Sequence, residues 1–166
     1  MSRVSQSSKQ LILLESLDDL VEHSIAVIEK ARRRIFLLSD TLDPHLYDRD
    51  DMTTALSAFA RRSRNSDLRM LVRDSDDLVE RGHRLARLHQ RLSTKVKLRI
   101  MTIEPGNSQM AYLLADSNLL VYKNDDMVHQ GFANYAAGSE VKPIAEEFLR
   151  IWEFANEIPD LRTLHL

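Results

Sequence analysis

The side chains of this chain best suited to chemistry are imidazoles and carboxylates. Imidazoles exchange protons near neutral pH and carboxylates bind hard cations, so together they suit a metal-dependent phosphodiesterase. His83 and His89 are six residues apart, which is not the i, i+4 spacing that places two ligands on one helix face. No metal site is therefore predicted. The set that such an enzyme would use is His83 or His129 with Asp40, Asp43 and Asp116.

A run of cations uninterrupted by acidic residues is the second candidate for function. It extends from Arg81 to Arg99. Such a run can contact the phosphates of RNA or DNA, but a solvated helix face has the same pattern, so both interpretations stay open. The run has no aromatic residue on which bases could stack. The predicted ligand-binding basic patch consists of Arg81, Arg84, Arg87, Arg91, Lys95 and Lys97.

Composition narrows the class of protein. The chain has 166 residues, no cysteine and a formal net charge of -2 at pH 7. The lack of cysteine excludes disulfides, thiolate catalysis and cysteine-ligated metals, and the small net charge means that any polyanion would have to bind a local patch. No apolar stretch is long enough to span a membrane and no signal-peptide pattern is present. We therefore expect a cytoplasmic protein with no cofactor and no membrane contact.

Hydrophobic periodicity predicts alternating strands and helices. Residues 1–10 are poor in apolar side chains and are predicted to form a flexible arm, with residues 11–166 as a single domain. The fold class expected from this order is α/β, with a mixed β-sheet flanked by helices on both faces. Strands are predicted at 10–15, 35–38, 68–72, 96–101, 110–115 and 118–122, the last two as a hairpin, and helices at 16–30, 53–64, 75–92 and 141–155.

Two short segments carry a family resemblance. Residues 109–116 read Gln-Met-Ala-Tyr-Leu-Leu-Ala-Asp, and residues 131–134 read Gly-Phe-Ala-Asn. With the order of elements from about residue 16 to 155, they resemble one repeat of the phospholipase D superfamily, whose signature is H-x-K-x4-D followed by G-S-x-N. In that superfamily the histidine attacks phosphorus, and the lysine and asparagine bind phosphate oxygens. The degenerate motif comprises Gln109, Ala111, Asp116, Gly131 and Asn134, with glutamine at the histidine position and alanine at the lysine position.

These replacements determine the chemistry that the resemblance implies. A glutamine amide is not a useful nucleophile, and an alanine methyl group cannot stabilise the charge that develops on a phosphorane. The covalent phosphohistidine route is therefore closed, and we predict no enzyme activity and no catalytic residue. The chain is also similar to phospholipase D-like domains that accompany some bacterial acetyltransferases.

Three functions remain as hypotheses. The leading hypothesis is a non-catalytic binding module that recognises RNA, DNA or another phosphate-rich ligand through the basic helix. The alternatives are an adaptor that binds a protein, or regulates a cytoplasmic enzyme, and a divergent phosphodiesterase. Because single-repeat members of the resembled superfamily pair two copies, we also expect a homodimer.

Overall fold

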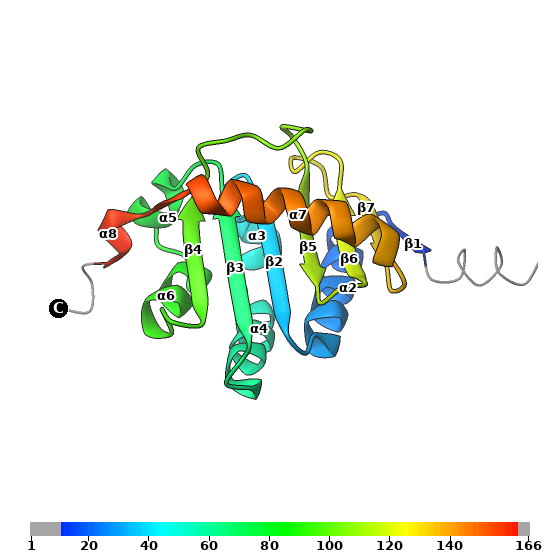
Figure 1. Ribbon diagram of the computed structural model, residues 1–166, viewed down its shortest axis with the longest axis horizontal. Helices are drawn as coiled ribbons and strands as arrows, with labels where there is room; N and C mark the ends of the chain where they lie inside the picture. The colour runs from blue at the N-terminus through cyan, green and yellow to red at the C-terminus, as the bar shows by residue number, and fades with distance from the viewer. Residues whose placement is uncertain (1–10, 163–166) are drawn as a thin grey trace, which may run out of the picture.

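The computed structural model describes residues 11–162. The flexible arm predicted for residues 1–10 lies outside the described residues, as do residues 163–166 at the end of the predicted domain. In the described part, one mixed sheet carries helices on both faces (Figure 1). The predicted fold class is confirmed.

The sheet has eight strands in the order β1-β7-β6-β5-β2-β3-β4-β8. The central strands β2, β3 and β4 are parallel, and all other neighbouring pairs are antiparallel. The predicted hairpin is present as β5 and β6, whereas β7 and β8 were not predicted. The strands are β1 (Leu11–Leu14), β2 (Arg34–Ser39), β3 (Asp67–Val72), β4 (Val96–Ile100), β5 (Ala111–Ala115), β6 (Leu119–Lys123), β7 (Gly131–Asn134) and β8 (Asn156–Glu157).

The helices form a layer on each side of the sheet. On one side lie α2 (Leu17–Lys30), α4 (Asp50–Arg62) and α6 (Arg84–Arg91), and on the other side lies α7 (Gly138–Phe154) (Figure 1). Short helices α3 (Pro44–Tyr47), α5 (Asp76–Glu80) and α8 (Pro159–Arg162) join or follow these elements. Each face has its own apolar core, because successive strand residues point to opposite sides.

Helix α7 covers its face of the sheet incompletely. It crosses the strands near the carboxyl ends of β2, β3 and β4 (Figure 1), where Phe148 stacks on Phe36 with ring centroids 4.4 Å apart. Nearer the amino ends of these three strands, the same face has no helix over it (Figure 1). We call this uncovered part of the sheet the open face.

The long helix predicted at 75–92 is wrong, because the chain turns between α5 and α6. Gly82 has a φ of 77°, in the left-handed region that favours glycine. His83 then caps α6, with Nδ1 accepting from the Leu85 N–H at 3.0 Å, while its Nε2 donates to the Leu42 carbonyl at 2.9 Å. A buried histidine that is bonded on both nitrogens fixes the break and holds α6 against the loop after β2.

The buried His83 predicts a pH dependence of stability. Burial is the main cause that lowers the pKa of His83 below its usual value, although the Leu42 carbonyl and Asp48 oppose it. His83 therefore binds a proton more readily in the unfolded chain than in the folded protein. The free energy of unfolding should fall as the pH drops below about 6.5. Urea denaturation between pH 8 and 5 measures this. His83→Asn, which retains a capping side chain, should lose stability overall and show a shallower decline; an unchanged decline would contradict the assignment.

Candidate functional site

The motif positions predicted from the sequence do not converge in the structure. Gln109 is exposed just before β5, and Ala111 is the buried first residue of β5. Because β5 runs antiparallel to β2, with Tyr112 opposite Leu38, both positions lie at the carboxyl edge of the parallel strands. Gly131 also begins its strand at this edge, where a Cβ would approach the Tyr122 carbonyl oxygen to 2.1 Å.

Asp116 lies at the opposite, amino edge of the sheet. It follows β5 in a left-handed conformation, with a φ of 55°. Its carboxylate accepts hydrogen bonds from the backbone N–H groups of Arg32 at 3.0 Å, Arg33 at 2.8 Å and Arg34 at 3.3 Å. Asn134 is also distant from Gln109, and its side-chain oxygen accepts from the Ala136 N–H. The Asp116 carboxylate is thus occupied in joining the hairpin to the start of β2.

A buried ammonium group lies beside Ala111, the predicted lysine position of the motif. Lys123 pairs across β5 and β6 with Ala111 and is 3% exposed. Its Nζ donates to the Asp126 carbonyl at 2.8 Å and lies 3.2 Å from the Asp126 carboxylate. The other carboxylate oxygen accepts from the Ser39 hydroxyl at 3.0 Å and the Asp40 N–H at 2.7 Å. Asp126 therefore neutralises Lys123 and binds it into a closed polar cluster.

The sequence analysis missed this cluster. Its signal was a lysine and an aspartate three residues apart at the end of the apolar strand β6. That spacing also occurs in exposed loops, and the partner residues Ser39 and Asp40 are more than 80 positions away in the chain. Only the sheet brings them together.

The carboxyl edge is predominantly acidic. Burial is the main cause that raises the pKa of Asp40, and the charges of Asp126, Asp74 and Glu104 add to it, while Arg73 opposes them. Arg73 is itself bound, with Nε 3.2 Å from Glu104 and Nη2 donating to the Met110 carbonyl. A phosphate placed at this edge would be repelled by these carboxylates.

The metal-dependent alternative has no assembled site at this edge. His129 contacts Asp43, with Nε2 2.8 Å from the carboxylate, but His83 is held in the core and Asp116 is at the opposite edge. Among residues 11–162, no group of three or more histidine, aspartate or glutamate side chains is arranged to hold a metal ion. The set suggested for a metallophosphodiesterase is not brought together.

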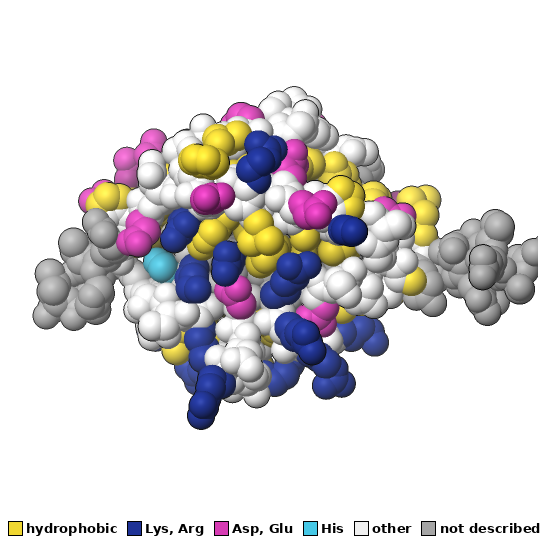
Figure 2. Space-filling model, in the orientation of Figure 1, with side chains coloured by type: hydrophobic (Ala, Val, Ile, Leu, Met, Phe, Trp, Pro, Cys, Tyr) yellow, Lys and Arg dark blue, Asp and Glu magenta, His cyan; other side chains and the backbone are white. Residues whose placement is uncertain are grey.

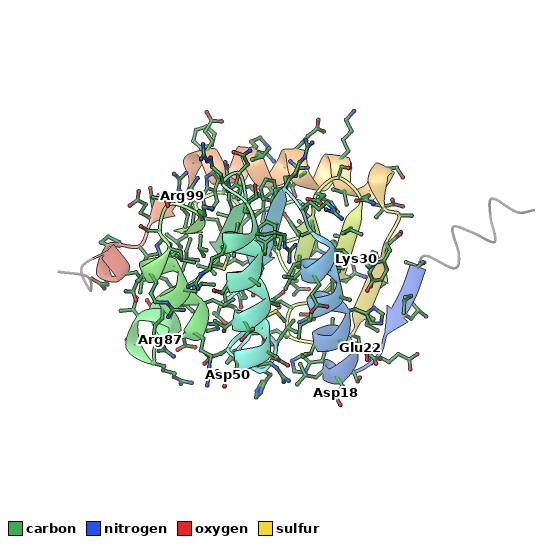
Figure 3. The ribbon with its side chains drawn as sticks, turned by 90° about the horizontal axis from the view of Figure 1, so that it is seen from below. Asp18, Glu22, Lys30, Asp50, Arg87 and Arg99 are labelled. Atoms are coloured by element: carbon green, nitrogen blue, oxygen red, sulfur yellow. The ribbon has the colours of Figure 1, made fainter. Side chains whose placement is uncertain are left out.

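The predicted basic patch is divided between different surfaces. Arg84 on α6 binds Asp48 and Asp50, with Nε 2.9 Å from Asp50, and the Lys95 Nζ donates to the Ser63 carbonyl. Arg81 lies 3.7 Å from Asp77, and Arg87 and Arg91 are exposed on α6. Lys97 belongs to the other side of the sheet, because it pairs with Arg69 on the α7 face. Figure 3, seen from the amino edge, shows α6 with Arg87 and α7 on opposite sides of the sheet.

A different set of cations gathers on the open face. We call Arg34, Arg69, Lys97 and Arg99 the open-face stripe; they come from β2, β3 and β4 and are all partly exposed. Three of them lie over aromatic rings: Arg34 is 4.9 Å from the Phe36 centroid, Arg69 is 5.4 Å from Trp152, and Arg99 is 4.5 Å from Trp152. These contacts hold the guanidinium groups in place on the sheet. Figure 2 shows Lys and Arg side chains clustered below α7.

The amino edge extends this positive surface. Helices α2 and α4 end there in basic residues, which suit the negative end of a helix dipole. The loops that enter β2, β3 and β4 are also rich in cations. Exposed or partly exposed cations along this edge are Lys30, Arg32, Arg33, Arg61, Arg62, Arg64, Arg91 and Lys95. In the described residues the two edges of the sheet thus carry opposite charge.

Solved structures of known proteins share this fold. NucT from Helicobacter pylori superposes with a TM-score of 0.66 at 10% identity, over 89% of this chain and 97% of its own. Nuc from Salmonella typhimurium, a phospholipase D family member, gives 0.55 at 13% identity, over 81% and 87%. TrmBL2, an archaeal chromatin protein with a novel mode of DNA binding, gives 0.62 at 15% identity, over 90% and 54%. This chain therefore spans about half of TrmBL2, and the fold is phospholipase D-like.

Sequence comparison identifies a family without adding an activity. The profile of a family described as a domain of unknown function (DUF7931) matches residues 16–164. No curated protein matches the sequence. Within residues 11–162, no helix has both the length and the apolar character needed to cross a bilayer.

Asp116 is predicted to stabilise the folded protein through its hydrogen bonds to backbone amides. Replacing it with asparagine removes the charge from hydrogen bonds to three backbone amides, and should lower the free energy of unfolding by about 1–3 kcal/mol. Asp116→Ala should cost more, because alanine tolerates the left-handed conformation less well than asparagine. Chemical denaturation measures both variants. Asp125→Asn at the other edge is the control, and an Asp116 variant as stable as that control would contradict the capping role.

The buried Lys123 and Asp126 pair makes a separate prediction. Lys123→Met leaves a buried carboxylate without its cation and should cost about 3–5 kcal/mol of unfolding free energy. Lys123→Met combined with Asp126→Asn should regain much of that loss, because the uncompensated charge is removed. A double-mutant cycle in denaturant measures the coupling. Strictly additive effects of the two substitutions would show that the pair is not coupled.

Proposed function

The chain belongs to the DUF7931 family, and we propose that it is a nucleic-acid-binding module without phosphodiesterase activity. The binding surface is the open-face stripe together with the basic amino edge. The observation that carries the proposal is the separation of charge across the sheet, which puts cations where the face is uncovered and carboxylates at the other edge.

The open-face stripe suits a phosphate backbone. Arginine forms paired hydrogen bonds to phosphate oxygens, and lysine adds a point charge. Arg69 and Lys97 lie directly opposite each other on adjacent strands, and Arg34 begins the next strand. Two carboxylates neighbour this group, Asp67 at 3.1 Å from Arg69 and Glu157 opposite Arg99 in register, so the four cations of the stripe keep a net positive charge. A sheet holds these cations at fixed spacings, which lowers the entropy cost of binding.

The carboxyl edge supports the non-catalytic part of the proposal. At the two positions that would carry an attacking imidazole and an ammonium group, Gln109 and Ala111 offer neither. The nearby ammonium of Lys123 is buried and paired with Asp126. Phosphate is disfavoured there by the surrounding carboxylates, so the phosphate-binding role is assigned to another part of the same fold.

The likeness to TrmBL2 is consistent with this assignment. That protein binds DNA and shares the fold over 90% of this chain. At 15% identity the likeness concerns the fold, so it adds plausibility to DNA as a ligand and does not locate the surface. The binding surface is located by the distribution of charge on this chain.

A protein-binding role is the second candidate, and an apolar groove favours it. The groove has a volume of about 420 Å³ and lies between α7 and the strands β6 and β7, lined in part by Met110, Tyr122, Phe132 and Ile144. Leu13 on the edge strand β1 is 70% exposed and pairs with Phe132 in register. Apolar surface of this kind is typical of contact with another polypeptide, including a second copy of the chain.

The nucleic-acid proposal predicts a salt-dependent affinity that depends on the stripe and on the amino edge, to which Arg33 belongs. A fluorescent single-stranded oligonucleotide should bind at low salt, and log K should fall linearly with log salt. Combining Arg33→Gln, Arg34→Gln and Arg69→Gln should weaken binding and lower the slope by about 0.7 for each phosphate that the variant no longer neutralises. Glutamine keeps part of the side-chain stem while removing the charge. Fluorescence anisotropy at several salt concentrations measures both quantities.

A control removes equal charge elsewhere. Arg81→Gln, Arg87→Gln and Lys142→Gln remove exposed cations away from the stripe, just after α5, on α6 and on α7. This variant should bind as the parent does; loss of affinity in it alone would move the interface to those surfaces. Absence of binding at low salt by the parent would reject the function in favour of the protein-binding role. The oligonucleotide should also be recovered intact, and cleavage that His129→Ala abolished would restore the phosphodiesterase hypothesis.

A further inference from the structure

A pocket opens at the β4 end of the open-face stripe. It has a volume of about 450 Å³, within the usual range for sites that hold small molecules. One wall is the end of α6 and the residue Ser93 beyond it, another is β4, and the third is formed by Glu157 of β8 and Leu161 of α8. The pocket is remote from the carboxyl-edge cluster of Lys123 and Asp126.

The edge of the sheet explains why the pocket exists. Strand β8 pairs with β4 at Arg99 and Ile100 alone, so in the described residues the earlier part of β4 has β3 on its inner side and no strand on its outer side. Two hydrogen bonds join α6 to the other two walls of the pocket, β4 and α8. His89 Nδ1 donates to the Val96 carbonyl at 2.6 Å, and Gln90 Nε2 donates to the Leu161 carbonyl at 2.9 Å. The gap is therefore held between fixed elements.

The pocket lining combines charge with apolar surface. Lys97 and Arg99 belong both to the open-face stripe and to the pocket, and Glu157 is the carboxylate in the lining. Ser93 adds a hydroxyl group, and Leu98 and Leu161 add apolar contact. A phosphate can pair with the two cations while a flat heterocycle packs beside the partly exposed His89 imidazole, which also lines the pocket, and this is the combination that one nucleotide presents.

We propose that this pocket binds a terminal phosphorylated nucleotide of the nucleic-acid strand that lies on the open-face stripe. The inference rests on the proposed function, because the stripe leads the strand to the pocket. Arg69 and Lys97 are opposite each other in register, on strands about 4.8 Å apart, so a backbone that contacts Arg69 reaches Lys97 directly. The chain then prefers strand ends over continuous strands.

Trp152 supplies a direct readout of the pocket. It is the single tryptophan of the chain and is 6% exposed. The Arg99 guanidinium lies 4.5 Å from its ring centroid and donates to its carbonyl at 3.0 Å. A phosphate that pairs with Arg99 changes the field at the indole, so its emission should change on binding. Adenosine 5′-monophosphate should give a saturable change, and adenosine or inorganic phosphate should bind roughly tenfold more weakly, because each lacks one half of the contacts.

The closing experiment compares strand ends in the full chain. One single-stranded oligonucleotide is used with a 5′-phosphate, with a 3′-phosphate, with hydroxyl groups at both ends, and as a covalent circle. A phosphorylated end should raise the affinity roughly tenfold over the hydroxyl-ended and circular forms. Ser93→Leu, which narrows the pocket without changing charge, should abolish this preference and the adenosine 5′-monophosphate signal while the circle still binds. Lys142→Gln is the control and should retain both.

The outcomes separate this inference from the proposed function. If all four oligonucleotides bind equally and adenosine 5′-monophosphate leaves Trp152 emission unchanged, the pocket assignment is overturned and the nucleic-acid interface stands. If Ser93→Leu retains the end preference, the ends are recognised elsewhere and the assignment also falls. If no oligonucleotide binds but the mononucleotide does, the polymer interface fails and the pocket remains a nucleotide site.

Discussion

One carboxylate joins the β5 and β6 hairpin to the central strand β2. Asp116 accepts hydrogen bonds from three successive backbone amides at the entrance to β2, and its carbonyl accepts a further bond from the Arg34 side chain. These bonds fasten the turn of the hairpin to the amino end of the central strand. Because β5 is antiparallel to β2, its first residue Ala111 must then lie at the carboxyl edge. The pairing of Ala111 with Lys123 follows from the same register.

At the carboxyl edge, the phospholipase D-like fold holds a stable ion pair. Lys123 lies on β6 opposite Ala111, and its ammonium group contacts the Asp126 carboxylate, which also accepts hydrogen bonds from Ser39 and from Asp40 at the start of the loop after β2. A charge committed to such a cluster stabilises one loop arrangement and is unavailable to an incoming anion. The acidic surroundings of Asp40 reinforce that effect.

The placement of α7 decides which surface is left for a ligand. Its aromatic residues pack on Phe36 near the carboxyl ends of the strands, and the remaining part of that face exposes arginine and lysine side chains (Figures 1 and 2). Trp152 at the end of α7 supports two of these arginines through ring contacts. The same helix therefore closes the core and orders the cations beside it. The open-face stripe and the pocket beside β4 share Lys97 and Arg99.

The sequence by itself determined the order of the strands β1 to β6, the hairpin and the α/β class, because apolar periodicity reports which side of each element is buried, but it missed β7 and β8. It also predicted that the two motif positions, Gln109 and Ala111, lack an imidazole and an ammonium group. It did not separate α5 from α6, since the break depends on the Leu42 carbonyl, 41 positions before His83. Nor did it place Lys97 on the opposite side of the sheet from α6. The face to which Lys97 points became known only from the strand pairing, in which Lys97 lies opposite Arg69. Tertiary structure alone decided which cations share a surface. Cations that are distant in the sequence become neighbours when their strands pair, and cations that are close in the sequence can point to opposite faces of the sheet.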